Sequence, residues 1–291
     1  MKTIVASDAG AAEILSFFAK KNKNEYNYLL KGTAKKIFKK NLGKYKTISL
    51  KESLKKTKLY ICGTGWQSDI HIQIIKATRY KDIKVIAYLD HWVNYKNRFL
   101  KNNKYYLPDE IWVGDEVAYK IAKKIFSIKV KKKINYYVNH IKKNFKDKSV
   151  KKKDLSKNIN ILYVTEPTSK VKDKWKINKY DYDEFSSLIF FLDKIKFVYK
   201  DFKIRLKTHP SENLKKYNNI LKKYDYNIEV CNSTNLLNEI KNSEVVVGCN
   251  TLALHIALVV KKDVLCSIPT KQKSLLPFNF FNVIVSSFAN V

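Results

Sequence analysis

Two short polar segments in the second half of the chain carry residue types suited to binding a phosphate. They are Arg205-Leu206-Lys207-Thr208-His209-Pro210 and Gly248-Cys249-Asn250-Thr251. Each follows an apolar run that predicts a buried strand and precedes a segment that predicts a helix. Ligands of parallel α/β sheets bind at the carboxyl ends of strands, and a helix N-terminus there offers free N–H groups to a phosphate. The two segments therefore predict a site for the phosphate of a nucleotide-activated sugar.

His209 is the candidate catalytic residue of the first segment. Pro210 suits the first turn of a following helix, which would leave His209 at the mouth of the sheet beside Lys207. A protonated imidazole there could donate to a phosphate oxygen as the leaving group departs. A loop histidine without a chemical role is the plainer interpretation.

The second segment offers Gly248, Asn250 and Thr251 as phosphate ligands, through backbone N–H groups and side chains at a helix start. Asn250 acting only as a helix cap is the alternative. Thr165 and Glu166 end the first strand of this half, where they could line the same site or belong to an ordinary loop.

Two turns in the first half of the chain also follow apolar runs. In the first, Gly10 permits a tight turn and Asp8 could act as a base, although Asp8 could equally well cap the next helix. In the second, Gly65 allows close approach of a ligand and Trp66 could stack on a sugar, although a tight turn with a packed tryptophan is the alternative. These turns predict the acceptor side of a site.

A dense group of polar residues follows the apolar run 85–89. Asp90 or His91 could serve as a general base, and His91, Asn94 and Arg98 could bind an acceptor. The alternative is that Asp90 caps a helix and His91 satisfies a buried backbone group. Nearby, Asp115 is interpreted as a helix cap and Trp112 as a core residue.

Apolar runs alternate with helical segments, which predicts an α/β protein with parallel sheets covered on both faces. The leading architecture has two Rossmann-like domains with a central cleft; a single doubly wound sheet is the alternative. We expect an N-terminal acceptor domain over 1–130, a basic linker over 131–157, and a C-terminal donor domain over 158–291. The expected strands are 3–6, 26–30, 47–50, 59–62, 84–89, 110–113, 159–164, 203–207, 228–230, 244–247, 264–267 and 283–286. The expected helices are 11–20, 34–41, 53–56, 69–80, 116–126, 134–145, 182–199, 212–224, 236–241 and 252–260.

The net charge of +32 suggests an anionic partner, but only three of the 58 basic residues are arginine. Nucleic-acid readers favour arginine for bidentate contacts, and the lysines are spread along the whole sequence. A solvated surface with some attraction to anionic lipid is therefore favoured over nucleic acid. Four scattered cysteines without a C-x-x-C pair indicate free thiols and a cytoplasmic protein. The basic surface would keep it peripheral at the inner membrane.

The placement of His209-Pro210 after a strand resembles the His-Pro motif of bacterial sialyltransferases and capsule-sugar transferases, which are glycosyltransferases of the GT-B fold. In that family a later helix start carries paired hydroxyl residues that bind the phosphate. Here the corresponding pair is Asn250-Thr251, so only Thr251 matches in chemistry. The resemblance implies that His209 binds or protonates the donor phosphate. It also implies that an N-terminal carboxylate, by position Asp8 or Asp90, deprotonates the acceptor.

The resemblance implies an inverting glycosyltransferase that uses a CMP-activated nonulosonic acid, such as sialic, legionaminic or pseudaminic acid, to build a bacterial surface glycan or glycoprotein. No cofactor and no metal are expected, since Asp181-Tyr182-Asp183 reads as a helix cap rather than a metal motif. The partners would be the donor, a glycan, lipid-linked or protein acceptor, and an anionic membrane. Alternatives are a nucleotide-sugar 2-epimerase or hydrolase of the same fold, and a basic nucleic-acid-binding protein.

Overall fold

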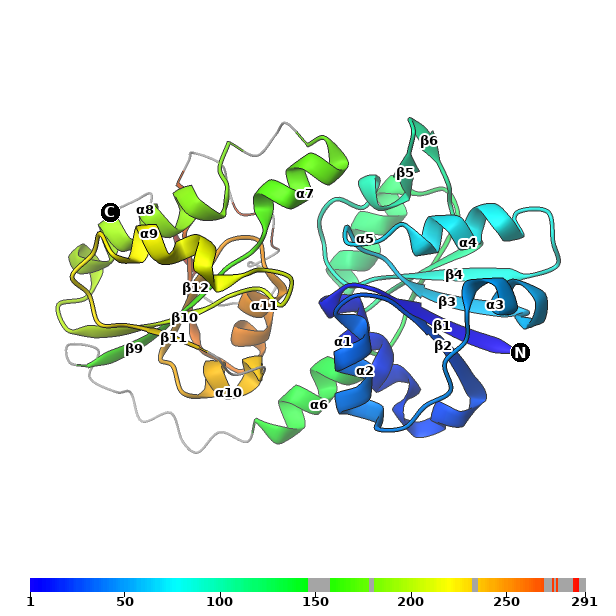
Figure 1. Ribbon diagram of the computed structural model, residues 1–291, viewed down its shortest axis with the longest axis horizontal. Helices are drawn as coiled ribbons and strands as arrows, with labels where there is room; N and C mark the ends of the chain where they lie inside the picture. The colour runs from blue at the N-terminus through cyan, green and yellow to red at the C-terminus, as the bar shows by residue number, and fades with distance from the viewer. Residues whose placement is uncertain are drawn as a thin grey trace. The chain divides into compact units, whose positions relative to one another are not determined.

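The chain forms two compact units, Met1–His140 and Ile141–Val291 (Figure 1). The computed structural model describes residues 1–145, 158–177, 181–231, 235–269, 274, 276 and 285–287. Each unit contains a six-stranded sheet in which every neighbouring pair of strands is parallel. The prediction of an α/β fold with two Rossmann-like domains is confirmed.

The sheet of unit 1 has the strand order β2-β1-β3-β4-β7-β8, and a small antiparallel hairpin lies outside it. Its central strands are buried over nearly their whole length, as the continuous apolar runs predict. The strands are β1 Lys2–Ala6, β2 Tyr26–Leu30, β3 Leu59–Gly63, β4 Lys84–Leu89, β7 Glu110–Val113 and β8 Lys129–Lys132, with the hairpin of β5 Leu100–Lys101 and β6 Lys104–Tyr105.

The helices of unit 1 begin and end at recognisable local signals. Ser49 accepts a hydrogen bond from the backbone of Glu52 to start α3, and Asp115 does the same with Ala118 to start α5. The last helix, α6, crosses the division between the units. The helices are α1 Ala9–Ala19, α2 Ala34–Leu42, α3 Leu50–Lys56, α4 Ile70–Thr78, α5 Glu116–Ile125 and α6 Tyr136–Asn144, with the 3₁₀ helices η1 Lys20–Glu25 and η2 Asn97–Phe99.

The sheet of unit 2 has the strand order β11-β10-β9-β12-β13-β14. Its core gathers Tyr163, Phe191 and Leu206 from a strand, a helix and a second strand. The strands are β9 Ile159–Val164, β10 Phe202–Lys207, β11 Ile228–Val230, β12 Val245–Gly248, β13 Asp263–Cys266 and β14 Val285–Ser287. The helices are α7 Thr168–Trp175, α8 Glu184–Val198, α9 Asn218–Leu221, α10 Leu236–Lys241 and α11 Leu252–Val259, with the 3₁₀ helix η3 Leu214–Tyr217.

In both sheets there is one point at which the next strand in sequence is added on the opposite side of the first strand. In unit 1 the chain goes from β1 to β2 on one side and then to β3 on the other. In unit 2 it goes from β9 through β10 to β11 and then crosses to β12 on the opposite side. At such a switch point the loops leaving the two adjacent strands separate, which opens a crevice at their carboxyl ends. The loops after β1 and β3, and after β9 and β12, are therefore the ones placed to bind a ligand.

Several expected elements differ from those observed. The expected strand 47–50 is wrong, because Thr47 makes a single bridge to Tyr28 and Ser49 already caps α3. No helix starts at Pro210; a turn follows β10, and Asn213 caps η3. Strand β8 and helix α7 were not expected, and β8 includes Lys131 and Lys132 of the expected linker. The linker residues 146–157 lie outside the described residues, and the domain boundaries stay a prediction.

Helix α8 offers a matched pair of phenylalanines for testing the unit 2 core. Phe191 is fully buried in the core, whereas Phe197 on the same helix is 65% exposed. We expect Phe191→Ala to lower the free energy of unfolding of unit 2 by about 3–5 kcal/mol, because it leaves a cavity. Phe197→Ala should change it by no more than about 0.5 kcal/mol. Urea unfolding followed by circular dichroism measures both, and equal losses would contradict this packing.

Candidate active site

The switch point of unit 2 brings together the ends of β9 and β12. Thr165 directly follows β9, and Gly248 ends β12. A Cβ added at Gly248 would lie 2.9 Å from the carbonyl oxygen of Val164, so only glycine lets the two strand ends approach this closely. Thr251 then caps α11, and its hydroxyl accepts a hydrogen bond from the backbone of Ala253. The phosphate-binding segment predicted from sequence therefore starts a helix beside β9.

Asn250, expected as either a phosphate ligand or the helix cap, does not cap α11; Thr251 does. The Asn250 side chain is buried, and its amide nitrogen donates to the Tyr182 hydroxyl at 2.8 Å. Its amide oxygen accepts from Ser274 at 3.0 Å. These bonds fix the loop before α11, and phosphate contact by Asn250 stays a prediction.

The His209 turn is tied to the end of β9 by Thr165. The Thr165 hydroxyl accepts a hydrogen bond from the backbone N–H of His209 at 3.0 Å and donates to Glu212. The backbone N–H of His209 also lies 3.3 Å from the Glu212 carboxylate. Two residues that sequence analysis placed in one site, Thr165 and His209, are thus in direct contact.

The ring of His209 is held in one orientation by Ser211. The backbone N–H of Ser211 donates to Nδ1 at 3.2 Å, and the Ser211 hydroxyl lies 2.7 Å from the same atom. An Nδ1 that accepts a hydrogen bond assigns the proton of the neutral ring to Nε2. Burial, which outweighs the attraction of Glu212, lowers the pKa of His209 to about 4. The ring is therefore neutral near pH 7, which corrects the expectation of a protonated imidazole, and Nε2–H is the donor it offers.

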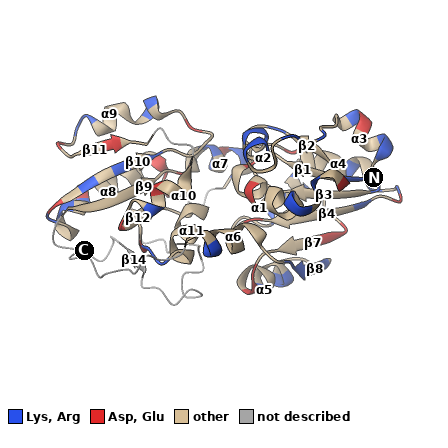
Figure 2. Ribbon diagram, turned by 90° about the horizontal axis from the view of Figure 1, so that it is seen from below, with Lys and Arg blue, Asp and Glu red and all other residues tan. Residues whose placement is uncertain are grey.

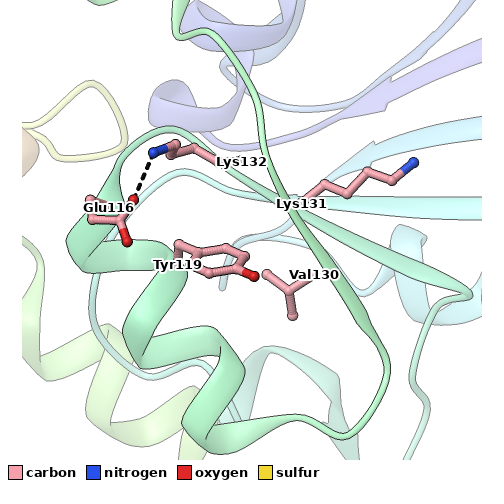
Figure 3. A pocket seen from close by; sticks show the side chains of 5 residues that line it. All are labelled: Glu116, Tyr119, Val130, Lys131 and Lys132. Atoms are coloured by element: carbon pink, nitrogen blue, oxygen red, sulfur yellow. Dashed lines mark hydrogen bonds and ion pairs between the residues drawn. The ribbon is translucent and has the colours of Figure 1, made fainter.

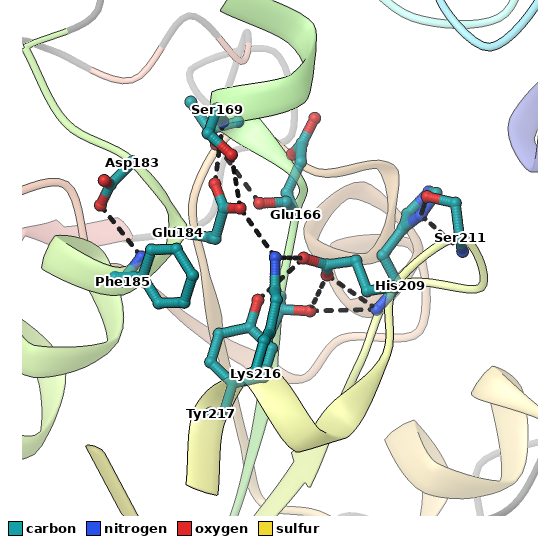
Figure 4. A network of polar contacts seen from close by, with 12 residues as sticks. Glu166, Ser169, Asp183, Glu184, Phe185, His209, Ser211, Lys216 and Tyr217 are labelled. Atoms are coloured by element: carbon teal, nitrogen blue, oxygen red, sulfur yellow. Dashed lines mark hydrogen bonds and ion pairs between the residues drawn. The ribbon is translucent and has the colours of Figure 1, made fainter. Parts of the chain in front are cut away.

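A chain of buried charges supports this turn (Figure 4). Glu212 accepts from the Tyr217 hydroxyl at 2.9 Å and pairs with Lys216. Lys216 also pairs with Glu184 at 2.7 Å. Glu184 in turn accepts from the backbone and the hydroxyl of Ser169 at 2.8 and 2.7 Å. The network joins the starts of α7 and α8 to the His209 turn.

Sequence analysis missed this network. Burial alone would raise the pKa of Glu184, but the hydrogen bonds from Lys216 and Ser169 hold it below its ordinary value. The spacing of Glu212 and Lys216 was a visible signal, although it is equally common on solvated helices. The contact with Glu184 depends on tertiary structure and leaves no local pattern.

The remaining donor-side residues lie around the same strand ends. Lys207 ends β10 and is half-buried, Glu166 follows Thr165 and is half-buried, and Pro210 is exposed in the turn. Their roles as phosphate ligands stay a prediction. Asp183 caps α8 with a complete capping box, which confirms the interpretation of Asp181-Tyr182-Asp183 as a cap.

The switch point of unit 1 is organised around the carboxylate of Asp8. Asp8 precedes α1 without bonding to that helix through its side chain. Its carboxylate instead accepts from the backbone N–H groups of Trp66 at 2.8 Å and Gln67 at 3.2 Å, and from the Ser7 hydroxyl at 3.0 Å. A Cβ added at Gly65 would lie 1.9 Å from Asp8 Oδ2, so this position requires glycine. The Asp8 and Gly65-Trp66 turns predicted separately from sequence are one structure.

The carboxyl group of Asp8 can exchange a proton near neutral pH. Asp8 is 7% exposed, and the pKa of its carboxyl group is raised to about 6. Loss of hydration on burial is the main cause, and repulsion from Asp90 is the second. The hydrogen bonds from Ser7, Gln67 and Trp66 act in the opposite direction. A base with such a pKa is mostly ionised at pH 7 and can still accept a proton.

Asp90 is the partner of a buried arginine. Its carboxylate lies 2.6 Å from Nη1 of Arg98, which is 6% exposed. The same nitrogen donates to the Thr64 hydroxyl at 2.9 Å and the Thr64 carbonyl at 3.3 Å. Arg98 therefore holds the loops after β3 and β4 together and compensates the charge of Asp90. Acceptor binding by Arg98 and catalysis by Asp90 stay predictions.

The other acceptor-side candidates lie in different local environments. Trp66 is half-buried beside Asp8, and the His91 ring contacts the Trp92 ring in a tilted arrangement with centroids 5.4 Å apart. Asn94 has a φ of 59°, the left-handed region that asparagine tolerates. Gly10, expected to permit a tight turn, lies instead inside the first turn of α1. The acceptor roles of these residues stay predictions.

The predicted structural roles of Asp115 as a helix cap and Trp112 as a core residue are confirmed. Asp115 caps α5 and accepts from the indole N–H of Trp92 at 3.0 Å. Trp112 is buried, and its indole N–H donates to Glu110 at 2.6 Å.

An open hollow of about 380 Å³ lies at the edge of the unit 1 sheet (Figure 3). It is lined by Tyr119 and Glu116 of α5 and by residues of β8. Lys132 pairs with Glu116 across it at 2.6 Å, and both side chains are largely exposed. The hollow is at the edge strand and not at the switch point, so it adds nothing to the candidate site. Its lining is Glu116, Tyr119, Val130, Lys131 and Lys132.

Basic residues are distributed over both units rather than gathered on one element (Figure 2). None of the helices within the described ranges has the length and apolar character needed to cross a bilayer. Within the same ranges, no cluster of three histidine, cysteine or acidic side chains is arranged to hold a metal ion.

Comparison with known proteins gives structural matches only. No family model matches the sequence, and no curated protein matches it. UDP-GlcNAc 2-epimerase from Neisseria meningitidis, solved with UDP-GlcNAc, matches with a TM-score of 0.64 at 13% identity, over 100% of this chain and 89% of that chain. The S. aureus MnaA–UDP structure matches with a TM-score of 0.64 at 12% identity, over 99% and 85%.

An α/β-galactoside α-2,3-sialyltransferase from Photobacterium phosphoreum matches with a TM-score of 0.53 at 10% identity, over 100% of this chain and 98% of that chain. The fold is GT-B. Identities this low establish the fold and leave the activity open.

The raised pKa of Asp8 makes the stability of the protein depend on pH in a defined direction. A carboxyl group whose pKa is about 6 when folded and about 4 when unfolded binds more proton in the folded state. Its contribution to stability is therefore greatest below the unfolded pKa and falls as pH rises through 6. We expect lowering the pH from 8 to 5 to stabilise wild type by about 1.4 kcal/mol relative to Asp8→Asn.

Urea unfolding of both proteins at the two pH values measures this difference. Ser7→Ala, which removes one hydrogen bond to the same carboxylate, is a control that keeps the titrating group. A difference between wild type and Asp8→Asn that does not change with pH would contradict the raised pKa.

Proposed function

We propose that this chain is an enzyme that acts on a nucleotide-activated sugar. The observation that carries the proposal is the His209 turn, which Thr165 ties to the end of β9 and in which Ser211 orients the ring, in the same sheet as β12 and the α11 start that follows it. A fixed Nε2–H and the free backbone N–H groups of a helix start are both donors suited to phosphate oxygens. The candidate donor ligands are therefore His209, Thr251 and Lys207.

The reaction that these groups support best is glycosyl transfer with inversion and without a metal ion. The acceptor oxygen attacks the anomeric carbon of the sugar as the bond from that carbon to the phosphate oxygen breaks. The acceptor proton passes to the Asp8 carboxylate, and the nucleotide leaves with the bonding electron pair. The neutral His209 ring stabilises the departing phosphate through a hydrogen bond from Nε2–H and does not carry a positive charge. Arg98 keeps Asp90 paired and so leaves Asp8 as the proposed base.

A CMP-activated nonulosonic acid is the donor we favour, and it rests on the His209-Pro210 resemblance. The acceptor would be a glycan, a lipid-linked sugar or a protein that becomes part of a bacterial surface. Thr165 and Glu212, which hold the backbone of His209, would act as positioning residues.

A second candidate is a nucleotide-sugar 2-epimerase or hydrolase. It is favoured by the higher TM-score of the two UDP-bound structures, 0.64 against 0.53 for the sialyltransferase. In that reaction no acceptor is needed, and the unit 1 carboxylates would act on the sugar ring or on water.

Binding of free nucleotides tests the shared part of the proposal. We expect CMP to raise the melting temperature of wild type without added metal, and a nucleotide at 100 times its Kd adds about 2.7 kcal/mol of stability. His209→Ala should lose most of this shift because the donor to the phosphate is gone. His140→Ala is the matched histidine control, since the His140 ring packs in a tilted arrangement against Phe17 of unit 1, with centroids 4.6 Å apart.

The pattern across CMP, CDP, UDP, GDP and ADP separates the candidates. A shift selective for UDP, with conversion of UDP-GlcNAc in the absence of an acceptor, would replace the glycosyltransferase with the epimerase. No shift with any nucleotide, together with salt-sensitive binding of nucleic acid, would contradict both.

A further inference from the structure

The amino ends of the unit 2 strands carry exposed Phe197 and Val198 beside half-buried aromatic side chains that pack on the core, interleaved with lysines. Helix α8 ends at Val198, β10 begins at Phe202, and β11 begins at Ile228, so these segments meet at the edge of the sheet opposite the candidate site. We call this the aromatic-lysine surface. It consists of Phe197, Val198, Tyr199, Phe202, Tyr224 and Tyr226, with Lys194, Lys196, Lys200, Lys222 and Lys223.

The aromatic residues of this surface are physically connected. Phe197 lies one turn beyond Asp193 on the same face of α8, and Asp193 accepts from the Tyr224 hydroxyl at 2.7 Å. The Tyr224 ring stacks on Tyr226 with centroids 5.8 Å apart, and Tyr226 packs against Phe202 at 5.4 Å. The residues therefore form one continuous patch.

Phe197 is the most exposed apolar side chain of the patch. It is 65% exposed, Val198 beside it is 36% exposed, and Ile189 two turns earlier on α8 is 38% exposed. The ammonium groups of Lys194 and Lys196 lie 5.8 and 5.2 Å from the centre of the Phe197 ring. An apolar side chain surrounded by cations in this way matches the interface of an anionic membrane, where the ring enters the headgroup layer and the lysines meet lipid phosphates.

We propose that the aromatic-lysine surface adsorbs to an anionic lipid bilayer. Its five lysines have four acidic residues in or beside the surface, Asp193, Asp201, Asp225 and Asp263, so an excess of one positive charge remains. Asp193 is bound by Tyr224, and Asp201 accepts from the backbone of Asn158 at 2.9 Å.

Two features favour lipid over single-stranded nucleic acid as the occupant. The exposed side chains of the surface include aliphatic Val198, which offers no stacking face to a base. The ring of Phe197 also has lysine ammonium groups over it, where a base would have to stack. The proposal is independent of the reaction that the enzyme catalyses.

Co-sedimentation with lipid vesicles tests this assignment. We expect full-length wild type to bind vesicles that contain phosphatidylglycerol as a third of the lipid, and to bind phosphatidylcholine vesicles far less. Phe197→Ser should weaken partitioning about tenfold, because burial of the ring is lost. Replacing both Lys194 and Lys196 by glutamate should weaken it by at least about tenfold and reduce its dependence on salt.

Tyr80→Ser is the matched control, since Tyr80 is 92% exposed and has Arg79 over its ring at 5.8 Å but lies outside the patch. Equal losses for Phe197→Ser and Tyr80→Ser would overturn the proposal. Equal binding to both kinds of vesicle would do the same. So would capture of single-stranded RNA, but not of vesicles, through Phe197. Nucleotide-induced thermal shifts of the variants should equal that of wild type, which separates this test from that of the catalytic proposal.

Discussion

Parallel pairing throughout both main sheets is the constraint on which the rest of this structure depends. Parallel strands require a crossover on a sheet face, and every strand then presents its carboxyl end at the same edge. The reversal of strand order between β1 and β3, and between β9 and β12, separates two loops at that edge in each unit. Asp8 lies in the loop after β1 and Thr165 in the loop after β9, so both candidate residues are at these switch points. Glycine at 65 and 248 is needed because the same arrangement crowds the backbone.

The buried charges of the two units are handled in different ways. In unit 2, Glu184 and Glu212 share the ammonium group of Lys216, so their charge is partly compensated and the network acts as a support. In unit 1, Arg98 compensates Asp90, while the hydrogen bonds to Asp8 within the described part of the chain come from backbone N–H groups and a hydroxyl. Burial and repulsion from Asp90 raise the pKa of Asp8 in spite of these hydrogen bonds, so its carboxylate can take up a proton. This contrast is the physical basis for assigning proton transfer to Asp8 and positioning to the other groups.

Sequence reasoning succeeded where a local pattern determines the outcome. Strands Tyr26–Leu30, Lys84–Leu89 and Ile159–Val164 are observed as expected because each is a continuous apolar run between polar segments. It failed where tertiary contacts decide. β8 is a lysine-rich edge strand, and its pairing with β7 supplies what its composition does not indicate. The segment after Pro210 folds as a turn because Ser211 bonds back to His209 and Asn213 caps the later helix. The contact between Asp8 and Gly65 also joins residues far apart in sequence.

The most direct test of the account is to map bound CMP on the backbone amide signals of the isotope-labelled protein by NMR. The account predicts that the largest chemical-shift changes fall on Thr165, His209 and Thr251, at the carboxyl ends of β9, β10 and β12. Changes at Phe197 and Tyr224, at the amino ends of the strands, should be absent. Changes centred on those residues, or spread evenly over the lysine-rich surface, would contradict a nucleotide site at the switch point.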